Sequence, residues 1–173
     1  MPLRSVSESV RAKPKRTRAE RNDEVRKRLF DAAAKVVGKL GYVEASVSRI
    51  TTRAKVAQGT FYNHFESRQA LLDELLPTIG LRMIDFIRAR SDTAPQGAEK
   101  ENARFRAFFD FLEAVPEFPR ILNEAEVYAP AGYERHLKNI ATAYMRSLTR
   151  GREAHLVNNF TDEELEAVVH MMM

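Results

Sequence analysis

One short stretch, residues 46–65, constrains the fold more than any other, because it reads as two short helices around a tight corner. Apolar residues three and four positions apart give the first helix one buried face, and Ser46 stands where its N-cap is expected. In the second helix, about Gln58 to His64, Phe61 faces inward and the other positions are polar or aromatic, without a carboxylate. A surface helix without acids suits an anionic partner. The pattern is that of a helix-turn-helix, whose second helix enters the DNA major groove.

The charge of the chain is divided unevenly around this motif. Residues 1–68 hold 16 Lys and Arg against 7 Asp and Glu, whereas residues 69–173 hold 12 against 17. A basic segment is drawn to nucleic acid because it releases counterions from the phosphate backbone. We expect residues 1–21 to form a basic arm that is disordered when free, with Lys13–Arg18 along phosphates or in a minor groove. The alternatives are a solubilising tail and an ordinary solvated basic face.

Two blocks of sequence resemble one known family. They are LFDAAAKVVGKLGY at 29–42 and AQGTFYNHFESRQALL at 57–72, and the run GTFYNHF followed by SRxALL is the most specific part. On these residues, the segment from about Val25 to Leu72 resembles the N-terminal domain of TetR-family transcriptional regulators. The remainder of the chain carries no motif that we can match to a family.

The fold is expected to be all-α, because no strand alternation or hairpin signal is present. We expect the arm at 1–21, a three-helix helix-turn-helix domain at 22–68 and, as the resemblance implies, a helical effector-binding and dimerisation domain at 69–173. After the motif, the expected helices span about 68–90 with a kink at Pro77, 99–115, 117–127, 133–150 and 161–173; the first helix of the chain spans about 23–40. Members of the resembled family usually have nine or more helices and dimerise through the last two. Either this chain is shortened at its C-terminus, or the helices at 133–150 and 161–173 form the dimer.

Two residues of the motif depart from the family pattern. Lys55 occupies the corner, where Gly is usual, and a Lys at positive φ costs on the order of 1 kcal/mol. Lys55 also places a cation near DNA. Arg49 stands where an acid is common, so the capping-box acid three residues after Ser46 is absent and the DNA face is expected to gain a charge.

The resemblance and the chemistry of the second helix together indicate the DNA-binding residues. We expect Gln58, Gly59 and Asn63 to read base edges, because Gln and Asn pair bidentately with adenine and Gly permits close backbone approach. The remaining residues are expected to contact phosphate or orient the helix: Ser46, Ser48, Arg49, Lys55, Thr60, Tyr62, His64 and Arg68. The alternative is that they are ordinary surface residues, and it carries most weight for Ser48.

An effector pocket is implied by the resemblance in the C-terminal half. Its expected lining residues are aromatic: Phe86, Phe105, Phe109, Phe118, Tyr128 and Tyr144. Candidate polar anchors are Arg104, Asn123, Glu124 and Glu126. The alternative is that these aromatic residues form plain hydrophobic core. In either case we expect the helix at 99–115 to be largely buried, because apolar residues cover much of its circumference.

Several classes of protein are not indicated. The chain has no Cys, so neither a disulfide framework nor a thiolate zinc site is expected. No apolar run approaches the roughly 18 residues of a membrane span, and the basic N-terminus lacks the apolar region of a signal peptide. We therefore expect a cytoplasmic protein. No Ser-His-Asp order, HExxH, P-loop or GxGxxG motif is present, so no enzymatic activity, cofactor or metal site is expected.

The resemblance implies a sequence-specific DNA-binding transcriptional regulator, most simply a repressor that a small-molecule effector releases from DNA. It would act as a homodimer on a palindromic operator. Two alternatives remain open at this point. One is an effector-independent regulator or an activator, and the other is an interaction module that does not bind DNA.

Overall fold

The computed structural model describes residues 17–153, 161, 163–164 and 167. Its elements in this part are helices, as expected, and no strand occurs among the described residues. They are α1 (Arg18–Leu40), α2 (Val47–Ala54), α3 (Gln58–Tyr62), α4 (Arg68–Ser91), α5 (Ala98–Ala114), α6 (Phe118–Tyr128) and α7 (Pro130–Glu153). Most of the helix expected at 161–173 lies outside the described residues. The sequence Thr161-x-x-Glu164 forms a capping box: the Thr161 amide donates to Glu164 Oε2 at 2.7 Å, and the Glu164 amide donates to Thr161 Oγ1 at 3.3 Å.

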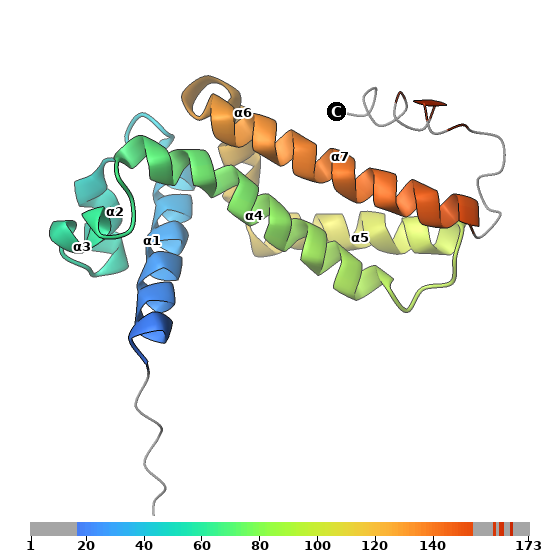
Figure 1. The fold of residues 1–173 in the computed structure, drawn as a ribbon, viewed down its shortest axis with the longest axis horizontal. Coiled ribbons are helices and arrows are strands. Elements are labelled where there is room, and N and C mark those ends of the chain that lie inside the picture. The colour runs from blue at the N-terminus through green and yellow to red at the C-terminus, as the bar shows by residue number, and fades with distance from the viewer. Residues whose placement is uncertain (1–16, 154–160, 162, 165–166, 168–173) are drawn as a thin grey trace, which may run out of the picture.

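The helices form two groups that α4 connects (Figure 1). Helices α1, α2 and α3 lie together at one end of the molecule, and α4 runs from them into the second group, where it packs against α5 and α7. Helix α6 contacts α1, α4 and α7, so it lies between the two groups. Helix α4 is continuous through Pro77, and its axis changes direction along its length in Figure 1.

Helix α1 begins earlier than the sequence analysis placed it. Thr17 is its N-cap: the Glu20 amide donates to Thr17 Oγ1 at 3.2 Å, and the Thr17 amide donates to Glu20 Oε2 at 2.7 Å. This capping box satisfies two backbone donors of the first turn, and it places the start of the helix five residues before the expected start at about residue 23. The last four residues of the expected disordered arm, 18–21, are therefore helical.

The core of the first group contains most of the apolar side chains expected from the spacing in α1 and the motif, together with Val37, which was not expected, and without Leu40, which is 41% exposed. The largest fully buried ones come from α1, α2, α3, the start of α4 and the loop after α1: Leu29, Val37, Tyr42, Ile50, Phe61, Leu71 and Leu72. Fully burying one large apolar side chain contributes roughly 1.5–3 kcal/mol. This shared core holds α2 and α3 at a set angle to α1 and α4.

Helix α5 is less buried than its composition had indicated. Phe111 is in the core, but Phe105 and Phe109 are 62% and 61% exposed. The reason is that α5 packs mainly against one neighbour, α4, so only one of its faces is covered. The expectation that α5 would be buried around most of its circumference is wrong for the part of the chain that the structure describes.

His136 of α7 is a buried polar residue at the contact with α4. Its side chain is 3% exposed, its ring lies edge-on to Phe118 at 6.1 Å between centroids, and Nδ1 has no hydrogen-bond partner among the described residues. Burial lowers the pKa of His136, because the charged imidazolium would lose its hydration. The folded protein therefore holds this imidazole neutral.

We expect the protein to lose stability in mild acid because of His136. Its pKa in the unfolded chain is about 6.5 and is lower in the fold, so its contribution is complete above about pH 6.5 and is lost as pH falls toward the folded pKa. Chemical denaturation between pH 7.5 and 5 should show a steeper loss for the wild type than for His136→Gln. Equal slopes would assign the acid sensitivity to other groups, such as His64, whose pKa is also lowered by burial.

Candidate nucleic-acid interface

Helix α3 presents one apolar face inward and one polar face outward. Phe61 is fully buried and its ring lies edge-on to Tyr62 at 5.2 Å, while Tyr62 itself is 58% exposed. Gln58, Gly59 and Asn63 are also exposed, and a Cβ placed on Gly59 would meet no atom of the protein within 4 Å. The packing of this fold therefore does not require glycine at position 59. An outer partner that approaches the backbone of α3 closely would require it.

Helix α3 is shorter at its C-terminal end than the expected span of Gln58 to His64. The helix stops at Tyr62, and Asn63 is its C-cap, so His64 lies just beyond it. The His64 carbonyl accepts a hydrogen bond from Arg26 Nη1 at 3.1 Å, which ties the end of α3 to α1. The pKa of the His64 imidazole is lowered, first by burial and then by the charge of Arg26. His64 is thus a neutral, half-buried donor or acceptor at neutral pH.

Lys55, at the corner between α2 and α3, has the positive φ that was expected at this position. Lys55 has φ 55° and ψ 48°, in the left-handed region. Arg28 of α1 supports this corner: its Nε donates to the Ala54 carbonyl at 3.0 Å and its Nη2 to the Lys55 carbonyl at 2.8 Å. These bonds satisfy carbonyls at the C-terminal end of α2. Arg28 was not among the residues that the sequence indicated, because its role depends on how α1 crosses α2.

Replacing Lys55 by Gly should raise the free energy of unfolding by about 1 kcal/mol, because glycine adopts the left-handed conformation without the Cβ clash. The control is Lys55→Ala, which removes the charge but keeps the Cβ and should give no such gain. Urea denaturation of the three proteins measures the difference. A gain in both variants would mean that the lysine charge, rather than backbone strain, is unfavourable at this corner.

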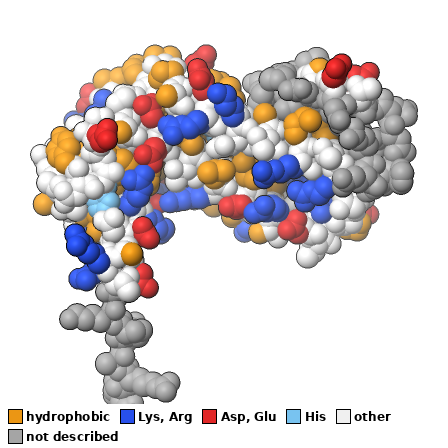
Figure 2. Space-filling view, in the orientation of Figure 1, with side chains coloured by type: hydrophobic (Ala, Val, Ile, Leu, Met, Phe, Trp, Pro, Cys, Tyr) orange, Lys and Arg blue, Asp and Glu red, His pale blue; other side chains and the backbone are white. Residues whose placement is uncertain are grey.

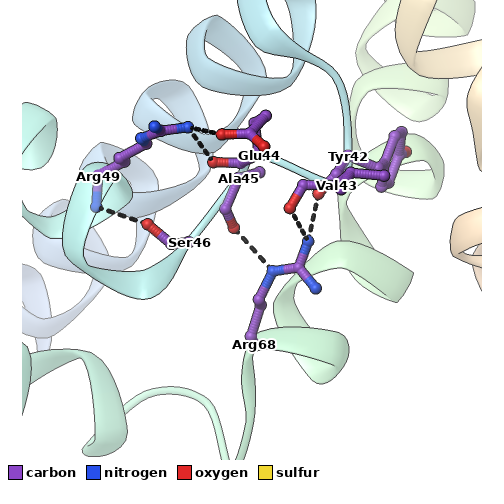
Figure 3. Close-up of polar contacts among 7 residues, drawn as sticks. All are labelled: Tyr42, Val43, Glu44, Ala45, Ser46, Arg49 and Arg68. Atoms are coloured by element: carbon purple, nitrogen blue, oxygen red, sulfur yellow. Dashed lines mark hydrogen bonds and ion pairs between the residues drawn. The ribbon is translucent and has the colours of Figure 1, made fainter.

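Arg49 does not add a free charge to the DNA face. Ser46 caps α2 as expected, with its Oγ accepting from the Arg49 amide at 3.3 Å. The Arg49 guanidinium, however, forms an ion pair with the Glu44 carboxylate and donates to the Glu44 carbonyl at 3.0 Å (Figure 3). Glu44 therefore offsets the charge that the sequence analysis had assigned to DNA.

Arg68 points into the protein rather than outward. Its Nε donates to the Ala45 carbonyl at 2.8 Å, and its Nη2 donates to the carbonyls of Tyr42 and Val43 (Figure 3). These bonds fasten the loop after α1 to the first turn of α4, where Ser67 is the N-cap. The expected phosphate contact of Arg68 stays a prediction, and these bonds give Nε and Nη2 of its guanidinium a structural role as well.

Few cations of the first group remain unpaired. Arg26 forms an ion pair with Glu74 and lies 4.5 Å from the centre of the Phe65 ring. Among the described residues, four are exposed and have no ion pair or side-chain hydrogen bond: Arg18 and Lys39 of α1, and Arg53 and Lys55 at the C-terminal end of α2. Arg53 is a DNA-facing candidate that the sequence analysis missed; its position four residues after Arg49 on α2 was the available signal.

Basic side chains are not confined to the first group. Figure 2 shows Lys and Arg along α1 and again over the C-terminal helices, in both places beside Asp and Glu. On the side of the molecule seen in Figure 2, the uneven charge of the two halves of the sequence does not form one continuous basic face. Local contacts, rather than net charge, have to define the interface.

The six aromatic residues expected around an effector do not meet in one cavity. Phe118 is in the core, Phe86 lies under the Arg90 guanidinium at 3.6 Å, and Tyr128 stacks on Tyr42 at 6.2 Å. The other three are exposed: Phe105, Phe109 and Tyr144. An open groove of about 520 Å³ lies between the end of α4 and α5, but none of the six lines it. Its lining is Arg90, Ala94, Pro95, Glu99, Asn102, Ala103, Arg106, Ala107 and Asp110.

No helix in the described part of the chain is long and apolar enough to span a bilayer. Within the same residues, no group of three or more His, Cys, Asp or Glu side chains is arranged to hold a metal ion.

Comparison with known proteins supports the interpretation of the motif. Residues 29–75 match the sequence model of a family described as bacterial regulatory proteins, tetR family. The chain is 30% identical over 102 residues to the HTH-type transcriptional activator FasR of Mycolicibacterium smegmatis, covering 59% of this chain and 47% of FasR. It is 23% identical over 141 residues to the HTH-type transcriptional regulator BetI of Escherichia coli, covering 72% of this chain and 70% of BetI. The chain thus spans about half the length of FasR.

A solved structure shows that the similarity of fold extends beyond the motif. The transcriptional regulator FadR of Bacillus subtilis, in complex with stearoyl-CoA, superposes with a TM-score of 0.68 at 19% identity, covering 84% of this chain and 81% of FadR. The family match lies on the helices that form the interface, and the fold match includes the C-terminal helices. This chain thus carries, at residues 29–75, a segment that matches the model of the tetR family of bacterial regulatory proteins, in a fold similar to that of FadR.

Proposed function

We propose that this protein regulates transcription by binding double-stranded DNA, with α3 in the major groove. The observation that carries the proposal is the outer face of α3, which has exposed Gln58, Tyr62 and Asn63, no acid, and a glycine with open space around it. The buried face of α3 and the arginine contacts to the ends of α2 and α3 hold this surface rigidly. The relatives that share the motif are transcriptional regulators, which supports the same function here.

The proposed assembly is a homodimer on a palindromic operator, with half-sites about 34–36 Å apart, or a multiple of that distance, so that both copies of α3 enter the groove. Gln58 and Asn63 would read bases, and Tyr62, Thr60 and His64 would position the helix on phosphates. Arg53 and Lys55 would add phosphate contacts from the end of α2. The protein would work in the cytoplasm, where its DNA lies.

We further propose that a small molecule controls this binding, with repression as the simplest outcome. The solved FadR structure contains stearoyl-CoA, so long-chain acyl-CoA is the first class of effector to test. One observation favours an effector-independent regulator as the second candidate, namely that the six expected aromatic residues do not line a common cavity. Thermal unfolding with stearoyl-CoA, and with free CoA as control, separates the two, since a ligand that binds the fold raises its midpoint.

The DNA-binding proposal is tested by fluorescence anisotropy with the promoter upstream of the gene itself, beside a shuffled duplex of equal composition. The salt concentration must be near physiological, because low salt promotes non-specific binding. We expect promoter binding about 10³-fold tighter or more. Tyr62→Ala should weaken it, whereas Val127→Ala, which changes an exposed apolar side chain on α6, should not. Equal, weak binding to both duplexes would call for site selection from random DNA, and failure there would exclude the proposal.

A further inference from the structure

Three charged residues of α6 and its N-cap lie on one face and point at the end of α1. Glu117, Arg120 and Glu124 are three and four positions apart, so their side chains lie one above the other along the helix. Each of them contacts the last turn of α1 or the residues that follow it. The face is therefore a set of polar contacts between the C-terminal helices and the helix-turn-helix.

Glu117 fixes the first of these contacts. Its Oε1 lies 2.5 Å from Lys35 Nζ, and its side chain is only 14% exposed. Gly38 makes the close approach possible, because a Cβ at position 38 would lie 2.9 Å from Glu117 Cα. Glu117, at the start of α6, thus packs directly on the backbone of α1 at Gly38.

Arg120 and Glu124 bind the backbone where α1 ends. Arg120 Nη1 donates to the Lys39 carbonyl at 2.9 Å, and the Tyr42 amide donates to Glu124 Oε2 at 2.9 Å. The two side chains also bind each other, with Arg120 Nε 2.6 Å from Glu124 Oε1. Burial alone would raise the pKa of Glu124, but the hydrogen bonds from Arg120 and the Tyr42 amide outweigh it, so that its pKa is lowered. Side chains of α6 therefore cap the end of α1, which has groups that its own turns leave unpaired.

The bound backbone leads directly to the DNA-reading helices. Tyr42 is held on two sides: its amide donates to Glu124 of α6, and its carbonyl accepts from Arg68 of α4. Four residues later, Ser46 caps α2. Any shift of α6 relative to α1 has to break these hydrogen bonds or move the loop at 41–45, and with it the start of α2.

We propose that Glu117, Arg120 and Glu124 form a latch through which the position of α6 sets the position of the helix-turn-helix. The three are positioning residues, since none lies on the outer face of α3. The regulatory part of this proposal rests on the proposed function, because it describes how a conformational change in the C-terminal helices would alter DNA binding. Coupling between two sites is reciprocal, so DNA binding must also change the conformational stability of α6.

The test uses hydrogen exchange of the full chain, with Glu124→Ala as the variant and Glu126→Ala as its matched control on the same helix. Glu126 is exposed and has no hydrogen bond or ion pair among the described residues. In the free protein, amides at 39–42 should exchange about tenfold faster or more in Glu124→Ala, because a hydrogen bond to a charged acceptor is lost, and at the wild-type rate in Glu126→Ala. Equal rates in both variants would overturn the latch whether or not the protein binds DNA.

The second readout is the response to bound operator. DNA should slow exchange in α6 of the wild type and of Glu126→Ala, and this protection should be absent in Glu124→Ala. Protection that is equally large in Glu124→Ala would overturn the proposal. If the wild-type protein binds no duplex, the proposed function is excluded. The exchange rates of amides 39–42 in the free protein would still show whether Glu124 holds the end of α1. If Glu124→Ala loses protection throughout α4, the variant is generally destabilised, and the same measurements are made on Gly38→Ala instead. Its Cβ would push α1 and α6 apart at Glu117 without removing a polar group.

Discussion

Arg68→Ala is expected to lower the free energy of unfolding by about 1–3 kcal/mol, the cost of leaving partly buried polar groups without their partner. The guanidinium serves three carbonyls, those of Tyr42, Val43 and Ala45, and two of these bonds are partly buried. Without it, the loop after α1 loses its tie to α4. The destabilisation should appear in urea unfolding of the protein without any DNA present.

The same variant distinguishes a structural arginine from one that contacts phosphate. A lost phosphate contact lowers the slope of log K against log salt by about 0.9. We expect this slope to be unchanged in Arg68→Ala, measured at a temperature where the variant is folded. Arg53→Ala is the matched control, because Arg53 is exposed and unpaired in the described part of the chain. It should lower the slope and leave stability unaltered. The reverse pattern would mean that Arg68 turns outward when DNA is bound.

The helices of this protein were largely predictable because their signals are local. The stripe of α1, the cap at Ser46, the positive φ of Lys55 and the boundaries of α5 all depend on residues close in sequence. The early start of α1 was also encoded locally, in the capping box of Thr17 and Glu20. It was overlooked because the surrounding sequence is basic, and all of residues 1–21 were assigned to a disordered arm. The exposure of Phe105 and Phe109 was not predictable, since it depends on how many neighbours α5 has.

The roles of the arginines show where sequence reasoning about the site reaches its limit. An arginine beside a DNA-binding motif was assigned to phosphate because its charge is visible in the sequence. Whether its donors are free depends on backbone carbonyls that lie far along the chain, such as Ala54 for Arg28 and Tyr42 for Arg68. The outer residues of α3 stay a prediction, but their exposure agrees with it.

Gly80→Ala is expected to destabilise the protein, although alanine is the better helix former. The gain in helix propensity is about 1 kcal/mol. Against it, a Cβ at position 80 would lie 2.5 Å from Cε1 of His136, and overpacking of a core costs about 1–3 kcal/mol. The ring cannot turn away at low cost, because it is buried and packed on Phe118. The cost of the steric clash should therefore exceed the gain in helix propensity. Denaturant unfolding at neutral pH should show a lower free energy of unfolding for Gly80→Ala than for the wild type.

A second background makes this prediction sharper, because it reverses the expected sign. In His136→Ala the ring is gone, so the methyl group of Gly80→Ala finds space and the propensity gain should dominate. The same substitution should then raise the free energy of unfolding, which gives a coupling energy between the two sites. Gly59→Ala is the control for propensity alone, since its Cβ meets nothing in the protein. It should not destabilise the fold, whereas its effect on DNA binding should be large if α3 approaches the groove closely. If Gly80→Ala destabilises both backgrounds equally, the close contact of α4 with α7 does not depend on His136.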